Sequence, residues 1–173
     1  ESSAASDVYK RQIQYNISPE KILGESGQGV NVNKMIDMKV PLNYLKHEGA
    51  CLTPNGAKFR NDSQGFLPEM MEKMYNDRVV FKQRMLKAKA EYQKTPTKEL
   101  AREIARCHNI QWSKKIALNS AYGAVGNQYF RFYDVRQASA ITTAGQFIIR
   151  YIEQKVNDYM NKILKQDEDF DYI

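Results

Sequence analysis

The fold is decided by residues 91–100, which have the sequence EYQKTPTKEL. A helical pattern of apolar residues precedes Thr95-Pro96-Thr97, and a second such pattern follows it. Pro96 breaks the first helix, but its fixed φ angle suits the first turn of the next helix, with Thr95 as a possible N-cap. Two long helices that are joined by about four residues lie antiparallel to each other. The sequence therefore predicts a helical hairpin.

Apolar side chains at helical spacing give the extent of three long helices. The first spans about residues 68–93, and the second ends near Tyr122, before two glycines. A third helix is expected over 135–164, because six apolar residues recur there at 3.6-residue spacing. Asp134 and Gln137, three residues apart, resemble a capping box at its start.

The segment that precedes the hairpin combines turns with short elements. Asn31 or Asn33 can cap a short helix. Turn residues then surround two short strands, over 57–60 and 65–67, which we expect to pair as a β-hairpin. The fold class is therefore α+β and mostly helical. An antiparallel helical hairpin lies beside a part that has one long helix and a few short strands.

The chain has 173 residues and a formal charge of +6, with only two cysteines. This composition excludes a collagen, a low-complexity chain and a disulfide scaffold, and it contains no apolar run long enough to span a membrane. Residues 69–115 hold twelve lysines and arginines against six acidic residues, so the whole net charge lies on the hairpin. Such a surface is either a solvated pair of helices or a site that grips phosphates.

One face of the second hairpin helix carries a chemically useful set of side chains. Lys115, Asn119 and Tyr122 stand at i, i+4 and i+7 and share a stripe. An ammonium, an amide and a phenol suit a phosphate, a hydrogen-bonded oxygen and a nucleobase, and Gly123 lets another group approach the backbone closely. The spacing alone favours a simpler interpretation, an ordinary helix surface that ends in a glycine cap.

The first hairpin helix can supply two further cations. Arg78 and Lys82 stand at i and i+4 and share a face. A guanidinium and an ammonium together make a good phosphate clamp. With Lys115 across the hairpin, three cations could converge on one triphosphate and stabilise the charge that develops in phosphoryl transfer. The alternative is two solvated cations among many.

Residues 115–123, with the sequence KIALNSAYG, resemble the fingers motif K-x-x-x-N-S-x-Y-G of family-B DNA polymerases. The resemblance covers residues 13–173 and is to the replicative enzymes of tailed phages. Five further strings match in the right order: NISPE at 16–20, TPNG at 53–56, GFLPE at 65–69, YFRFYD at 129–134 and AITTAGQ at 140–146.

This resemblance implies a DNA-directed DNA polymerase, which adds deoxynucleotides to a primer 3′ end. Four side chains of the hairpin would bind the incoming triphosphate: Arg78, Lys82, Lys115 and Asn119. Lys115 would also be the catalytic residue, because it can protonate or neutralise the leaving pyrophosphate. Tyr122 and Gly123 would contact the nascent base pair from its minor-groove side. The hairpin would close over a matched pair by induced fit.

The chain departs from the family at the metal site. The family uses two Mg²⁺ ions held by two aspartates. The first aspartate opens a D-x-x-S-L-Y-P-S string, but residues 3–10 here are SAASDVYK. The second belongs to a D-T-D-S string that would follow Ile173. Both ligands are missing, so we expect no metal site in this chain and an inactive fragment of an active parent enzyme.

The resemblance divides the chain into four parts. Residues 1–12 are expected to be a foreign or disordered leader. Residues 13–67 form a palm segment with a short helix and a β-hairpin, and residues 68–123 form the fingers. Residues 124–173 form a second palm segment with a long helix, truncated at its C-terminus.

The expected partners are primer–template DNA, a deoxynucleoside triphosphate and, for the parent, a sliding clamp. We expect a monomeric polymerase in the host cytoplasm, with no membrane association. Two other hypotheses stay open: a non-enzymatic basic hairpin that binds nucleic acid, and a purely structural helical domain. His47, Cys51, Cys107 and His108 lack paired zinc-ligand spacing, so no zinc site is assigned.

Overall fold

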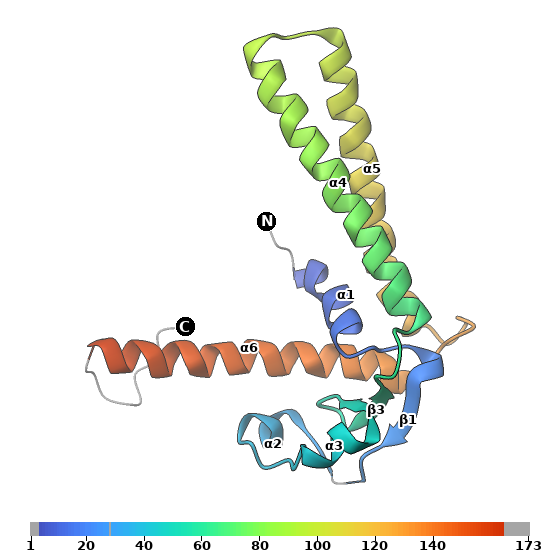
Figure 1. Ribbon diagram of the computed structural model, residues 1–173, viewed down its shortest axis with the longest axis vertical. Helices are drawn as coiled ribbons and strands as arrows, with labels where there is room; N and C mark the ends of the chain where they lie inside the picture. The colour runs from blue at the N-terminus through green and yellow to red at the C-terminus, as the bar shows by residue number, and fades with distance from the viewer. Residues whose placement is uncertain (1–3, 28, 165–173) are drawn as a thin grey trace.

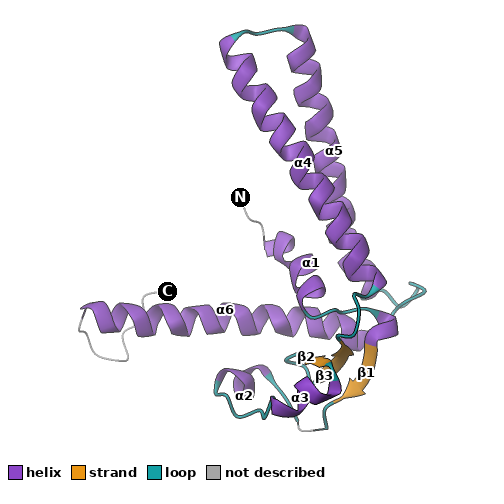
Figure 2. Ribbon diagram, viewed as in Figure 1, coloured by secondary structure: helices purple, strands orange, loops and turns teal. Residues whose placement is uncertain are grey.

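The computed structural model describes residues 4–27 and 29–164, and helices dominate it (Figure 2). The α+β, mostly helical class is therefore confirmed. The elements in chain order are α1 (Ala4–Gln14), the 3₁₀-helix η1 (Pro19–Lys21), β1 (Ile22–Glu25), α2 (Val32–Ile36), α3 (Asn43–Glu48), β2 (Ala50–Leu52), β3 (Ala57–Arg60), α4 (Phe66–Lys94), α5 (Lys98–Val125) and α6 (Val135–Leu164).

Helices α4 and α5 form the predicted hairpin, which projects as an arm from the rest of the molecule (Figure 1). Thr97, and not Thr95, caps α5, because its hydroxyl accepts a hydrogen bond from the Leu100 N–H at 3.2 Å. Helix α5 also continues past the predicted end at Tyr122, and Gly126 is its C-cap. The glycine at position 123 is therefore inside the helix.

Three strands form an antiparallel sheet in the order β1-β3-β2 at the base of the hairpin. The prediction of a strand over 57–60 is confirmed by β3, but its predicted partner over 65–67 is wrong. Gly65 is the N-cap of α4, and Phe66 begins that helix. β3 pairs instead with β2, through a turn at Gly56 whose φ of +87° favours glycine.

Helix α6 begins at Val135 as predicted, and it is helical as far as Leu164, the last described residue. Its first half packs on the sheet, where Ala140 and Ile141 join Ile17 and Phe59 in a buried core. Asp134 accepts a hydrogen bond from the Arg136 N–H at 2.8 Å, as an N-cap does. Further along, α6 extends away from the sheet (Figure 1), and its apolar side chains there are exposed.

Residues 4–14 form helix α1, although the sequence predicts a foreign or disordered leader there. This helix lies in the angle between the hairpin and α6 (Figure 1), and it contacts α4, α5 and α6. Buried Tyr9 packs against Met71 and Leu118. Near residue 170, polar and apolar side chains alternate, which predicts the start of a strand, but these residues lie outside the described ones.

Candidate functional site

The α5 stripe, which we define as Lys115, Asn119 and Tyr122, is partly buried along its whole length. The ammonium of Lys115 lies 5.0 Å from the centre of the Trp112 ring, in cation–π geometry. Lys115 forms no ion pair with any residue of the described ranges. The ammonium of Lys115 therefore contacts an aromatic face and not a carboxylate, so a phosphate can take the place of the Trp112 ring.

A partly exposed ion pair joins the two helices of the hairpin at the level of the predicted site. Lys114 Nζ donates to Asp77 Oδ2 at 2.8 Å, and this hydrogen bond lowers the pKa of Asp77. Because Asp77 precedes Arg78 and Lys114 precedes Lys115, Arg78 and Lys115 lie at about the same level of the hairpin. Lys82 lies about one helical turn from Arg78, towards the tip.

Two buried polar atoms of the predicted site have no hydrogen-bond partner within the described residues. One is Nε of Arg78, and the other is Oδ1 of Asn119. Leaving a buried donor or acceptor unpaired costs about 1–3 kcal/mol, so such groups are rare in proteins. A bound ligand that supplies the missing partners would remove this cost. The same property is shared by Arg11 Nε, Gln12 Oε1 and Gln137 Oε1, which lie outside the predicted site.

Tyr122 connects α5 to α6 at the foot of the hairpin. Its hydroxyl lies 2.9 Å from Thr142 Oγ1, which donates its own proton to the Ala138 carbonyl at 3.0 Å. Tyr122 is therefore the donor to Thr142. The next residue, Gly123, faces open space, because an added Cβ there meets no atom within 4 Å. No packing contact within residues 4–27 and 29–164 explains this glycine, which is consistent with the close approach of another molecule.

Asn119 and Tyr122 also line a cavity of about 430 Å³, whose other walls come from α6 and α1. Ligand pockets commonly have volumes of about 300–1,000 Å³. The structure thus brings Asn119 and Tyr122 to one cavity. Lys115, Arg78 and Lys82 lie further along the hairpin, outside the lining of this cavity.

Sequence reasoning missed two aromatic side chains that extend the α5 stripe towards the tip. The rings of His108 and Trp112 stack with their centres 6.3 Å apart. Trp112 stands three residues before Lys115, and His108 stands four residues before Trp112, so both follow the same helical spacing. Trp112 and His108 stand at i−3 and i−7 from Lys115, so helical spacing alone could have placed them on the same stripe.

The residues present do not fit a metal centre. Within residues 4–27 and 29–164, no three His, Cys, Asp or Glu side chains gather as ligands. Cys107 is buried in the hairpin and donates to Glu103 Oε1 at 3.2 Å, which is a structural contact.

The sequence matches DNA polymerase family B over residues 12–172. The chain belongs to the family-B DNA polymerases. The match begins at residue 12, so residues 1–11 lie outside it. In the part of the chain that the structure describes, no helix is both long enough and apolar enough to span a membrane.

Two phage enzymes are similar to this family-B chain over most of its length. The DNA-directed DNA polymerase of Escherichia phage RB69 is 29% identical over 191 residues, covering 87% of the chain and 21% of the relative. The DNA-directed DNA polymerase of Enterobacteria phage T4 is 29% identical over 199 residues, covering 91% of the chain and 22% of the relative. The chain thus spans about a fifth of the length of these relatives.

The fold is similar to that of an archaeal family-B DNA polymerase, from the hyperthermophile Pyrobaculum calidifontis. The two structures superpose with a TM-score of 0.57 at 22% sequence identity. The match covers 92% of this chain and 17% of the archaeal chain. The α4–α5 hairpin, the small sheet and α6 therefore form one contiguous part of a family-B polymerase fold.

Proposed function

We propose that this chain is the palm–fingers part of a DNA-directed DNA polymerase that extends a primer 3′ end with deoxynucleotides. Residues 68–123 are the fingers, and residues 13–67 and 124–173 belong to the palm. The observation that carries the proposal is that Arg78 Nε and Asn119 Oδ1 have no hydrogen-bond partner among the described residues, while Lys115 lies over the Trp112 ring. Lys115 and Asn119 belong to the family's string at residues 115–123. Membership of family B supports the reaction type.

The cations of the hairpin bind the triphosphate. Arg78 offers a fork of donors to phosphate oxygens, and Lys82 adds a mobile point charge one turn away. Lys115 leaves the Trp112 ring, binds the β- and γ-phosphates and neutralises the pyrophosphate as it departs, giving its proton to the leaving oxygen. Asn119 supplies its unpaired amide oxygen to a donor of the nucleotide or of the closed hairpin.

The C-terminal end of α5 contacts the nascent base pair. Tyr122 presents its ring beside the base, with its hydroxyl already held by Thr142. Gly123 leaves room for the minor-groove edge of the pair. Closing of the hairpin brings the cations onto the triphosphate only when a matched pair fits, so binding energy is used for selection.

Two Mg²⁺ ions, as used in this family, would supply Lewis-acid chemistry at the primer hydroxyl and at the transferred phosphate. Their aspartate ligands are not among the residues of this chain, so no step is assigned to the metals here. We expect the isolated chain to be inactive in primer extension. The parent acts on primer–template DNA and dNTP as a monomer with a sliding clamp, in the host cytoplasm.

The test uses adjacent lysines in the intact polymerase. We expect Lys115→Ala to slow single-nucleotide incorporation by roughly 100- to 1,000-fold, as the loss of a transition-state charge does. Lys114→Ala, its matched control, removes an equal charge that is engaged with Asp77, and it should stay within about fivefold of the parent. Rapid-quench measurements of incorporation and filter binding of the duplex separate chemistry from DNA affinity.

Equal rates for the two variants would exclude the role of Lys115. A non-enzymatic basic hairpin, the second candidate, is favoured by the twelve lysines and arginines on residues 69–115. Under that alternative both lysine variants weaken DNA binding to the same small extent, and the intact protein does not extend a primer.

A further inference from the structure

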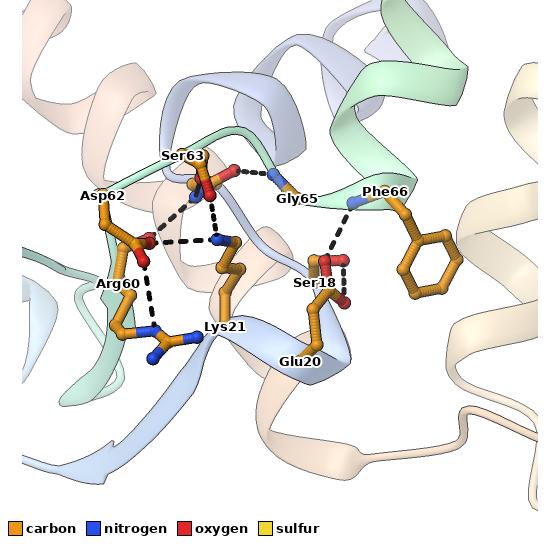
Figure 3. A network of polar contacts seen from close by, with 9 residues as sticks. Ser18, Glu20, Lys21, Arg60, Asp62, Ser63, Gly65 and Phe66 are labelled. Atoms are coloured by element: carbon orange, nitrogen blue, oxygen red, sulfur yellow. Dashed lines mark hydrogen bonds and ion pairs between the residues drawn. The ribbon is translucent and has the colours of Figure 1, made fainter.

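The first turn of α4 is held by side chains that are distant in sequence (Figure 3). Its N-cap is Gly65, which has no side chain to accept a hydrogen bond. Glu20 Oε1 accepts instead from the Phe66 N–H at 2.8 Å, and Ser18 Oγ accepts from the Leu67 N–H at 3.4 Å. Ser18 in turn donates to Glu20 Oε2 at 2.6 Å, which orients the carboxylate.

The loop that precedes α4 is fixed by the same segment. Lys21 is buried, and its ammonium donates to Asp62 Oδ1 at 2.9 Å and to Ser63 Oγ at 2.6 Å (Figure 3). Asn16 Nδ2 donates to the carbonyls of residues 60 and 63, at 2.7 and 2.9 Å, and Asn16 Oδ1 accepts from the Gly65 N–H at 2.7 Å. We call residues 16–21 and 60–67 together the α4 clamp.

Close backbone approach explains the glycine in the α4 clamp. Gly65 is buried, and a Cβ at that position would lie 2.6 Å from Ser18 Cβ and 3.0 Å from Glu20 Oε1. The φ angle of Gly65 is −73°, so the requirement is steric and not conformational. Any larger residue must push α4 away from residues 18–20.

The other foot of the hairpin is held far more loosely by polar contacts. Across the described residues, the end of α5 is tied to α6 by the hydrogen bond between Tyr122 and Thr142, which is exposed. A Cβ added at the neighbouring Gly123 would meet no atom within 4 Å. The α4 end of the hairpin is therefore held by six or more hydrogen bonds, whereas the α5 end is held mainly by buried apolar side chains such as Leu118 and Val125.

We propose that the α4 clamp is the pivot about which the hairpin turns when it closes on the nucleotide, with Ser18 and Glu20 as positioning residues. The inference rests on the proposed function. Arg78 lies twelve residues beyond Phe66, or about 18 Å along the helix. A tilt of about 10° at the α4 clamp therefore moves the Arg78 backbone by about 3 Å, enough to make or break a phosphate contact.

The experiment measures orientation and activity separately. Spin labels on Gln83→Cys in α4 and Gln154→Cys in α6, in a Cys51→Ser background, report the hairpin angle as a distance distribution in the chain itself. Glu20→Ala should broaden that distribution, and Glu20→Gln, which keeps an acceptor oxygen, should restore it. Glu69→Ala, an exposed acid in the first turn of α4, is the control for charge near the helix N-terminus.

In the intact polymerase, Glu20→Ala should raise the KM for dNTP about tenfold, which corresponds to one charge-assisted hydrogen bond. Duplex affinity should change by less than about twofold, since neither Glu20 nor Ser18 carries a positive charge that could pair with a DNA phosphate. Ser18→Ala is a milder change that should also raise the KM for dNTP. It replaces Glu20→Ala as the test variant if Glu20→Ala fails to fold.

Distance distributions and KM values for Glu20→Ala and Ser18→Ala that equal those of Glu69→Ala would overturn the pivot. A parent protein that does not extend a primer, but whose distance distribution still broadens with Glu20→Ala, would overturn the proposed function alone.

Discussion

The α4 clamp and the α5 stripe are both polar, partly buried regions of one hairpin, yet they differ in how their hydrogen bonds are used. In the α4 clamp, the amide of Asn16, the ammonium of Lys21 and the carboxylate of Glu20 all have partners. In the site, Arg78 Nε and Asn119 Oδ1 have none among the described residues. Polar groups whose hydrogen bonds are all made hold a structure in place, whereas unpaired ones can still bond to a ligand.

The largest expected effect comes from a site residue whose loss leaves the fold intact. Arg78→Ala in the intact polymerase should lower kcat/KM for dNTP roughly 100-fold, because a fork of phosphate contacts is lost. Its stability to urea should not fall, because an unpaired buried donor is removed together with the side chain. Arg84→Ala, an exposed cation beside Phe81 on the same helix, is the matched control. A large loss of stability in Arg78→Ala would contradict the distinction between the site, whose polar groups are unpaired, and the α4 clamp, whose polar groups support the fold.

The second effect, on stability, belongs to the α4 clamp. Asn16→Ala leaves two carbonyls and the Gly65 N–H without partners, and it places alanine at a φ of +52°. We expect the free energy of unfolding to drop by about 2–4 kcal/mol. Urea unfolding of the chain followed by circular dichroism measures this drop. The exposed Asn127, whose side chain accepts a bond only from Tyr129, is the comparison, and a similar drop in Asn127→Ala would contradict the prediction.

The smallest effect is a dependence on pH. Burial acts to raise the pKa of Glu20, but hydrogen bonds from Ser18 and from backbone N–H groups outweigh it, so the folded pKa lies below the ordinary 4.5. The folded state therefore favours the carboxylate. Its stabilisation is complete above pH 4.5 and is lost as the pH falls through the lower folded value.

Because Glu20 is largely exposed, the change should stay at or below about 1 kcal/mol. It is measured as the difference between parent and Glu20→Gln in urea titrations at pH 7 and at pH 3. A difference that is the same at both pH values would show that the carboxylate adds nothing through its charge.

The long elements of the fold could be predicted because their signals are local. Apolar spacing predicted the long course of α6 from Val135, and the break at Pro96 placed the two arms of the hairpin. The predicted strand over 65–67 failed because the groups that cap α4 come from residues 16–20, more than forty positions away. No local pattern records such partners, so the start of α4 could only be seen in three dimensions.

The candidate site divides in the same way. Helical spacing alone put Lys115, Asn119 and Tyr122 on one stripe, and the family string gave them their expected roles. The bond from Tyr122 to Thr142 and the unpaired Nε of Arg78 depend on how three helices pack. Trp112 could have been found from spacing, because it stands one turn before Lys115.

The separation in sequence of the residues that form the α4 clamp also has a kinetic consequence. Its bonds join groups 41 to 49 positions apart, whereas the hairpin can zip from its tip at residues 94–98 with small loop closures at each step. Gly65 connects the hairpin, which forms from its tip, to the segment that carries the sheet. The α4 clamp around Gly65 therefore forms late in folding. Weakening it should speed unfolding and leave the folding rate nearly unchanged.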